Sequence, residues 1–317
     1  MIPNISLCVT TYNSESLITS LLDKLQESAN YAGINYEIIV VDNNSEDSTI
    51  DLVNNYSNTL LIQNQDVGNV SRSRNLAMKK AGYQYCWFFD DDSLINKDLV
   101  VKAISILEKT NADVLMPLVV NSNGVPLNCK KKHNNKIDYS LKADEIILDF
   151  SSCFLINVEI IRKRSLYFDE DIKFMWEDVE YFYRLKRNGV RFVYTHSLPI
   201  QHRVKEINNH MGKRFYLQTK NAIILFRYLN KEERRDFRNY CPGGNFYIFM
   251  ILSFFTALLN YNFWADFYNP KVETLFDRFR SLLNPKRIRL DRSNITSMYY
   301  YFNGILNGLS YIKKVQS

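Results

Sequence analysis

Three consecutive carboxylates, Asp90, Asp91 and Asp92, directly follow the aromatic segment 87–89, and no Lys or Arg adjoins them. Neighbouring carboxylates repel one another unless a cation lies between them. Hard divalent cations such as Mg²⁺ bind oxygen ligands of this kind. The three aspartates therefore indicate a site for a hard divalent cation. The alternative is a solvated turn in which one aspartate caps a helix.

Other common cation and phosphate motifs are absent from the sequence. The aspartates do not begin an EF-hand loop, because the sixth position counted from Asp90 is Ile95, where that loop requires glycine. Neither GxxxxGK[ST] nor GxGxxG occurs. A bound nucleotide would therefore depend on the cation for much of its phosphate binding.

A second pair of carboxylates, Glu177 and Asp178, follows Trp176 at the start of an aromatic-rich segment with helical spacing. Acidic residues are favoured in the first turn of a helix, which is the simplest interpretation of the pair. A carboxylate so placed could also accept a proton as a general base. A third acidic run, residues 169–171, is interpreted as a solvated loop.

The segments around these residues predict strands that alternate with helices. Apolar runs predict strands at 5–12, 36–45, 60–64 and 83–89, and helical spacing predicts helices after an N-cap at Ser14, at 46–55 and at 70–81. This order predicts an α/β fold with a mostly parallel sheet flanked by helices, whose ligand lies at the carboxyl ends of the strands. Polar clusters at 10–13, 42–45 and 90–93 follow three of these strands, so we expect them to converge.

The remaining segments predict a further core and a helical end. A helix and a strand are expected within 97–116, an exposed excursion at 120–145 and a core segment at 151–161. Beyond these, we expect a helix at 177–188 with Gly189 as its C-cap, a strand up to residue 194, and a helix at 214–229. The apolar segment 246–259 is shorter than the roughly 20 residues of a membrane span. It is expected to be a buried or an interfacial helix.

Charge divides the chain into two parts, which we expect to be domains. Residues 205–317 hold 18 of the 40 Lys and Arg residues but only 8 of the 34 Asp and Glu residues, so residues 1–204 are slightly acidic. The basic part fits an anionic lipid surface or an anionic substrate, and it could also support a homo-oligomer. No zinc-finger spacing or RNA-binding aromatic motif occurs, so nucleic acid is not an expected partner.

The cysteine pattern and the amino-terminal residues indicate a cytoplasmic location. Five cysteines are scattered without a CxxC motif, which is typical of core residues in a reducing compartment. The segment MIPNISLCVTTYN has neither the basic nor the long apolar region of a signal peptide.

Five sequence pieces in order resemble family 2 glycosyltransferases of the GT-A fold. They are TTYN (10–13), VVDNNS (40–45), DVGNVSRSRN (66–75), FFDDDS (88–93) and WEDVEYFYRLKRNG (176–189), and together they cover roughly residues 4–203. The last piece is similar to that of bacterial rhamnosyl-, galactofuranosyl- and galactosyltransferases of surface polysaccharide synthesis. It does not specify the sugar.

The resemblance implies a role for each matching residue. It assigns nucleotide-sugar binding to Thr10, Tyr12, Asn13, Asp42, Asn44, Arg74, Asp90 and Asp91, with Asp42 at the base, Asp91 toward the ribose and Arg74 near the diphosphate. It assigns a metal ion, Mg²⁺ or Mn²⁺, to Asp92, Asp90 and His202. It assigns catalysis to Asp178 and Glu177, and acceptor stacking to Trp176. Asp178 is the preferred base. Arg72 is expected to point to solvent, because residues two apart do not share a helix face.

The resemblance implies an inverting transfer from a nucleotide sugar, such as UDP-galactofuranose or dTDP-rhamnose, to a hydroxyl of a surface glycan. The expected acceptor is a growing O-antigen or capsule glycan on a lipid carrier, reached at the inner face of the cell membrane. Two alternatives stay open. One is a haloacid-dehalogenase-like phosphatase with Asp90 as nucleophile and Asp92 as acid/base. The other is a non-catalytic glycan- or membrane-binding module on a GT-A scaffold.

Overall fold

The computed structural model describes residues 4–124, 153–203, 211–238 and 302–307. The chain divides into two compact units, residues 1–206 and 207–317. In the second unit, the described residues include helices α7 (Met211–Tyr228) and α8 (Lys231–Arg238). The roles that the sequence predicts for the two parts stay predictions.

Two predicted segments cannot be compared with the structure in full. The apolar segment 246–259 and most of the excursion 120–145 lie outside the described residues. Within the described ranges, no helix combines the length and the apolar character that crossing a membrane requires. Cys8, Cys86 and Cys153 are buried free thiols.

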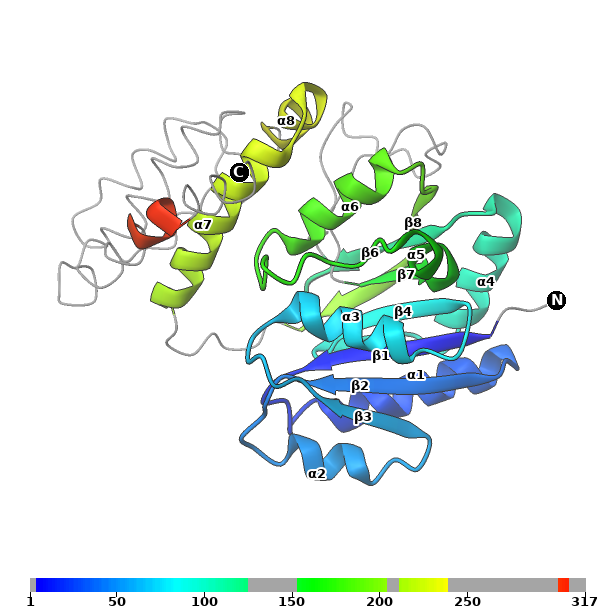
Figure 1. The fold of residues 1–317 in the computed structure, drawn as a ribbon. Helices are drawn as coiled ribbons and strands as arrows, with labels where there is room; N and C mark the ends of the chain where they lie inside the picture. Colours follow the sequence, from blue (N-terminus) through cyan, green and yellow to red (C-terminus); the bar gives the residue numbers. More distant parts are fainter. Residues whose placement is uncertain (1–3, 125–152, 204–210, 239–301, 308–317) are drawn as a thin grey trace. The chain divides into compact units, whose positions relative to one another are not determined.

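The first unit is built on a sheet of eight strands in the order β3-β2-β1-β4-β7-β6-β8-β5 (Figure 1). The strands are β1 (Ile5–Thr11), β2 (Tyr36–Asp42), β3 (Thr59–Gln63), β4 (Tyr85–Asp90), β5 (Ser93–Leu94), β6 (Val114–Val120), β7 (Phe154–Asn157) and β8 (Phe192–His202). Strands β1 to β4 are parallel, whereas β7 is antiparallel to β4 and to β6. The predicted α/β fold with a mostly parallel sheet is confirmed.

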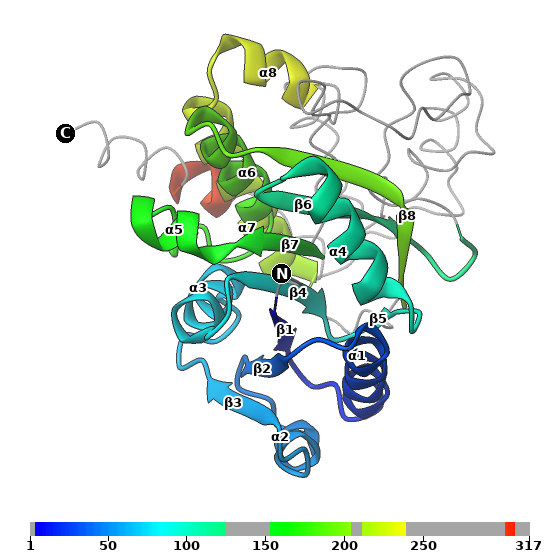
Figure 2. The same cartoon turned by 90° about the vertical axis from the view of Figure 1, so that its right-hand side faces the viewer.

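Helices cover both faces of this sheet (Figure 2). Helices α1 (Ile18–Ala32) and α4 (Leu99–Thr110) lie on one face, α3 (Val70–Lys80), α5 (Val158–Arg164) and α6 (Glu177–Arg187) lie on the other, and α2 (Thr49–Asn54) lies beside α1. Strand side chains alternate between the two faces. Trp87 and Phe89 join the core under α1 and α4, whereas Phe88 stacks on Phe154 at 4.8 Å between ring centroids on the other face.

Strand β8 is much longer than the sequence predicts, and its length matters for the site. It pairs with β6 on both sides of a register shift between Pro117 and Leu118, and its last two residues also pair with β5. There His202 pairs with Ser93 in antiparallel register. The end of β8 therefore lies directly beside the three aspartates.

The two helix caps predicted from the sequence, Ser14 and Gly189, are wrong by three residues and by one. Helix α1 begins at Ile18 with Leu17 as its N-cap, because the Ser14 hydroxyl bonds to Asp91 and to the Tyr12 carbonyl instead of capping the helix. Helix α6 begins at Glu177 as predicted, but its C-cap is Asn188. Gly189 follows one residue later with φ of 69°, in the left-handed region that glycine tolerates best.

Candidate active site

The carboxyl ends of β1, β2 and β4 place the three polar clusters at one edge of the sheet. The parallel registers set Thr10 beside Asp90 and Thr11 beside Asp42. This pairing brings the clusters 10–13, 42–45 and 90–93 together, as parallel strands require.

The middle aspartate, Asp91, fastens the loop that follows β1. Its side chain is buried, and Oδ2 accepts hydrogen bonds from the Thr11 hydroxyl at 2.9 Å and from the Tyr12 backbone N–H at 3.0 Å. The Ser14 hydroxyl donates to the same oxygen. Asp91 therefore organises the β1 loop, while a contact with a ribose stays a prediction.

The outer aspartates meet His202 from the end of β8. His202 Nε2 lies 3.5 Å from Asp90 Oδ2, and Nδ1 lies 3.2 Å from Asp92 Oδ2. Each of the three side chains offers one ligand atom, and these atoms all lie within 4.8 Å of one another. Two carboxylates and an imidazole suit a divalent cation, so this cluster fits a metal ion.

Electrostatics support the same interpretation of the cluster. The hydrogen bond with Asp90 raises the pKa of His202, and the charges of Asp92 and Asp90 add to this effect. The raised pKa reports a site with excess negative charge. A bound cation would satisfy that charge and would bind the neutral imidazole.

Glu177 and Asp178 open α6 after two residues with unusual backbone conformations. Met175 and Trp176 have φ values of 66° and 69°, which non-glycine residues adopt at a cost. Glu177 is buried, and its Oε1 lies 2.9 Å from Arg74 Nη1. Asp178 is half-buried.

Arg74 is a buried cation among several carboxylates. Its guanidinium lies 5.3 Å from the centroid of the Phe168 ring and 5.9 Å from that of Phe154. Burial lowers the pKa of Arg74, but the charges of Glu177, Asp90 and Asp178 together raise it. Arg74 therefore links the metal cluster electrostatically with the α6 carboxylates.

One cation does not neutralise both α6 carboxylates. Burial, followed by the charge of Asp178, raises the pKa of Glu177 to about 7 despite the ion pair with Arg74. Burial also raises the pKa of Asp178, and Arg74 offsets only part of this shift. Raised carboxylate pKa values are suited to proton transfer near neutral pH.

The residues predicted to bind the nucleoside differ in exposure. Tyr12 is 46% exposed and Asn44 is exposed, so both side chains reach solvent at the sheet edge. Asp42 is fully buried and accepts hydrogen bonds from the Ser45 N–H at 2.9 Å and the Ser45 hydroxyl at 2.5 Å. Asn13 accepts from the Glu46 N–H at 2.8 Å, so it also shapes the loops. Thr10 is half-buried on β1 beside them.

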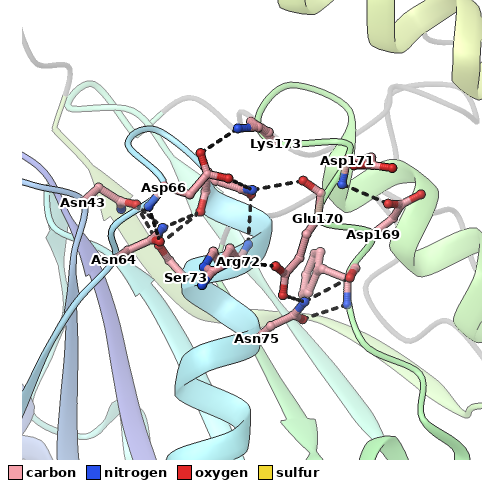
Figure 3. Close-up of polar contacts among 12 residues, drawn as sticks. Asn43, Asn64, Asp66, Arg72, Ser73, Asn75, Asp169, Glu170, Asp171 and Lys173 are labelled. Atoms are coloured by element: carbon pink, nitrogen blue, oxygen red, sulfur yellow. Dashed lines mark hydrogen bonds and ion pairs between the residues drawn. The ribbon is translucent and has the colours of Figure 1, made fainter. Parts of the chain in front are cut away.

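Sequence reasoning missed a set of polar contacts that surrounds the first turns of α3 (Figure 3). Asn64 donates to Asn43 Oδ1 at 3.1 Å and to the Ser73 hydroxyl at 2.9 Å. On the other side, Asn75 contacts the loop 168–173. Several polar residues in DVGNVSRSRN were a possible signal, but their partners are distant in sequence.

Residues 6–165 match the family model described as glycosyl transferase family 2, which is slightly more than half of the 317 residues. The chain belongs to glycosyl transferase family 2. TarS of Staphylococcus aureus, a poly(ribitol-phosphate) beta-N-acetylglucosaminyltransferase, is 30% identical over 174 residues, which are 53% of this chain and 30% of that protein. The poly(ribitol-phosphate) beta-glucosyltransferase of Bacillus spizizenii is 27% identical over 210 residues, which are 58% of this chain and 33% of that protein.

This family 2 chain spans about a third of the length of these two curated relatives. Among solved structures, the crystal structure of S. aureus TarS 1-349 superposes with a TM-score of 0.59 and 20% sequence identity. The superposition covers 98% of this chain and 92% of that one. It confirms the expected GT-A fold.

Family membership overturns the haloacid-dehalogenase-like alternative. In the structure the aspartates follow the fourth strand of the chain, after three strand–helix units. A phosphatase of that class would carry its nucleophilic aspartate near the start of its domain.

Proposed function

We propose that this chain is a metal-dependent inverting glycosyltransferase that uses a nucleotide-sugar donor. The observation that carries the proposal is the arrangement around Arg74. Arg74 interacts electrostatically with Asp90 of the metal-competent cluster and with the α6 carboxylate pair, whose pKa values are raised.

The donor end of the proposed site consists of the strand-end residues. Tyr12 and Asn44 are exposed for contact with the nucleoside, and Thr10 is half-buried beside them. Asn13 and Asp42 hold the surrounding loops by hydrogen bonds. Asp90, Asp92 and His202 would hold Mg²⁺ or Mn²⁺. When bound, this cation supplies positive charge to the diphosphate of the donor and to the leaving group. Solved structures of TarS with UDP and with UDP-GlcNAc support a uridine diphosphate sugar as donor.

Asp178 is the proposed general base. It is half-buried and open to an acceptor, whereas the Glu177 carboxylate is buried and paired with Arg74 at 2.9 Å. The acceptor hydroxyl gives its proton to Asp178 as its oxygen attacks the anomeric carbon. The bond from that carbon to the diphosphate breaks, the nucleoside diphosphate leaves with the electron pair, and one displacement inverts the configuration.

The proposed acceptor is a hydroxyl of a cell-surface glycan or a lipid-linked sugar. The relatives that act on poly(ribitol phosphate) support a polymer of the cell surface. Trp176, which is half-buried beside Asp178, would stack on an acceptor ring. The basic residues 205–317 would then contact the inner face of the cell membrane.

A thermal-shift screen tests the donor and the metal. UDP-GlcNAc, UDP-glucose, UDP-galactofuranose and dTDP-rhamnose are added with and without Mn²⁺ to the wild type and to Asp92→Ala. A ligand of the folded state raises the unfolding midpoint. We expect a shift that needs both Mn²⁺ and Asp92. A shift indifferent to both would contradict the proposed metal role.

Nucleoside diphosphate release tests the chemistry separately. We expect Asp178→Asn to keep the thermal shift with donor and to lose release of the diphosphate. A variant that retains release would remove Asp178 from the role of base. A wild type that binds donors but never releases the diphosphate, with water or with poly(ribitol phosphate), would favour the non-catalytic module.

A further inference from the structure

The loop that contains the acidic run 169–171 lies against the first turns of α3 (Figure 3). The sequence predicts a solvated loop here, but the backbone carbonyls and one side chain of this loop are bonded to α3. We call the contacts between residues 168–173 and residues 66–75 the loop clamp.

Asn75 makes the innermost contacts of the loop clamp. Its side chain is 2% exposed. Its Nδ2 donates to the Phe168 carbonyl and to Glu170 Oε1, both at 3.0 Å, and its Oδ1 accepts from the Phe168 N–H at 2.8 Å. A buried amide that satisfies a backbone N–H and C=O together fixes the position of that residue.

The same loop accepts hydrogen bonds from the amino end of α3. The first N–H groups of a helix lack partners within the helix. Here the Lys173 carbonyl accepts from the Val70 N–H at 2.8 Å, and the Ile172 carbonyl accepts from the Ser71 hydroxyl at 2.5 Å. Asn69 Nδ2 also donates to the Glu170 carbonyl at 3.0 Å. This helix end therefore binds protein backbone.

The segment held by the loop clamp leads directly into the α6 carboxylates. Phe174, Met175 and Trp176 separate Lys173 from Glu177, and the last two are in the left-handed region. Glu177 is then bonded to Arg74, which also belongs to α3. Strained backbone of this kind persists only where its surroundings over-determine it. Helix α3 meets that requirement because it fixes the chain on both sides of the strained pair.

We propose that Asn75 is a positioning residue, which acts through the loop clamp to hold Trp176 and Asp178 in their catalytic orientation. The inference rests on the proposed function, since Asp178 must act as the base for its orientation to affect the rate. Small displacements of a catalytic group are enough to slow a reaction by about a hundredfold.

Asn64→Ala is the matched control for Asn75→Ala. Asn64 is also a buried asparagine beside α3, and its Nδ2 donates to Asn43, Asn69 and Ser73. Its Oδ1 accepts from the Asp66 N–H, so none of its partners lies in 168–173. Both variants remove a buried amide, so both lower stability. Only Asn75→Ala removes contacts with the segment that leads to Trp176 and Asp178.

Hydrogen exchange of the free protein tests the loop clamp without any assumption about activity. We expect Asn75→Ala to increase amide exchange at least about tenfold in peptides covering 168–180, with unchanged exchange in β1 and β4. Asn64→Ala should leave 168–180 as in the wild type. Equal exchange of 168–180 in Asn75→Ala and wild type would overturn the clamp. This result would say nothing against the proposed glycosyl transfer.

Turnover then tests the positioning role. With Mn²⁺ and the nucleotide sugar that gives the largest thermal shift, Asn75→Ala should lower kcat for diphosphate release about a hundredfold while the Kd for the donor stays unchanged. Asn64→Ala should keep kcat within a few-fold. A kcat loss of the same size in both variants would reduce Asn75 to a stability residue. Absence of turnover in the wild type would instead refute the proposed function.

A charge-neutral exchange gives a rescue test. In Asn75→Asp, a carboxylate replaces the amide opposite the Glu170 carboxylate and the Phe168 carbonyl, which are both acceptors. These contacts are then lost, so kcat should fall as much as in Asn75→Ala. Combining Asn75→Asp with Glu170→Gln restores the hydrogen bond between the two side chains with donor and acceptor reversed. We expect the double variant to recover at least tenfold in kcat. A double variant no better than Asn75→Asp would count against the inference.

Discussion

The two sides of the candidate active site are held in place by different means. Asp90 is the last residue of β4, a strand paired on both sides, and Asp92 lies two residues further on. His202 is placed by the pairing of β8 with β5. Asp178 stands after a loop whose position depends on side chains of α3. The metal side is thus set by sheet register and the base side by a limited number of polar contacts.

This difference separates two kinds of vulnerability. Main-chain pairing persists when one side chain is replaced, so the metal side should lose function mainly through its own ligands. The base side can lose function through residues that never touch a substrate. A change of Asn75 in α3 should therefore affect catalysis without affecting cation binding.

The largest effect should come from the base itself. Asp178→Asn removes the proton acceptor but keeps the shape of the side chain, so we expect a kcat loss of about 10³- to 10⁴-fold. Diphosphate release at saturating donor measures it. The cation side should be untouched, with an unchanged Mn²⁺ dependence of donor binding. A parallel loss of Mn²⁺ binding would show that the two sides are not independent.

Arg74→Met should have the next largest effect, because it leaves the Glu177 carboxylate buried without its ion partner. Breaking a buried pair in this way costs about 3–5 kcal/mol in the free energy of unfolding. Urea unfolding at pH 8 measures the loss. Adding Glu177→Gln should recover much of it, since the uncompensated charge is then absent. No recovery in the double variant would indicate that Arg74 acts through its packing between Phe154 and Phe168.

Glu177 should make stability depend on pH. Its folded-state pKa of about 7 lies above its ordinary value of 4.5, so the folded protein keeps a proton that the unfolded chain releases. The stability that this proton contributes to the folded state is fully present below about pH 4.5. As the pH rises to 7 it is lost, which lowers the free energy of unfolding by about 3 kcal/mol. Glu177→Gln should lack this part of the slope in urea unfolding between pH 5 and 8. Identical slopes in the two proteins would contradict the raised pKa.

The smallest effect should come from the Arg72–Glu170 ion pair at the edge of the loop clamp. Arg72 and Glu170 are exposed partners 3.5 Å apart, and exposed pairs contribute about 0.2–1 kcal/mol. Arg72→Ala should therefore keep kcat and change the unfolding free energy by less than about 1 kcal/mol. A large kcat loss would show that the Arg72–Glu170 pair, rather than Asn75, holds the loop in position.

The sequence was sufficient to predict where the strand ends of the metal side converge. Apolar strands and their order predict the α/β sheet, and the polar residues after each strand predict where Thr10, Asp42 and Asp90 converge. Local patterns suffice because strand pairing follows from hydrophobicity and spacing. The start of α6 at Glu177 was also predicted from a local pattern, the helical periodicity of the residues that follow it.

The base side could not be predicted in the same way. The bonds from Asn75 to Phe168 and Glu170 join residues more than 90 positions apart, and no local pattern encodes such partners. The Ser14 hydroxyl was assigned to a helix cap because the competing carboxylate, Asp91, lies 77 positions away. The length of β8 was underestimated because the strand continues through polar and proline-containing sequence, 195–202.

The Asp91 carboxylate has a thermodynamic consequence for the free enzyme. It lies between two residues that would hold the cation, and it also accepts hydrogen bonds from Thr11 and Tyr12 at the nucleoside end. Ordering either end should therefore favour the bound arrangement of the other. Because such coupling is reciprocal, the factor by which Mn²⁺ tightens nucleotide binding must equal the factor by which the nucleotide tightens Mn²⁺ binding. Asp91→Ala should reduce both factors together, so one cluster of hydrogen bonds would make the enzyme a cooperative binder of metal and donor.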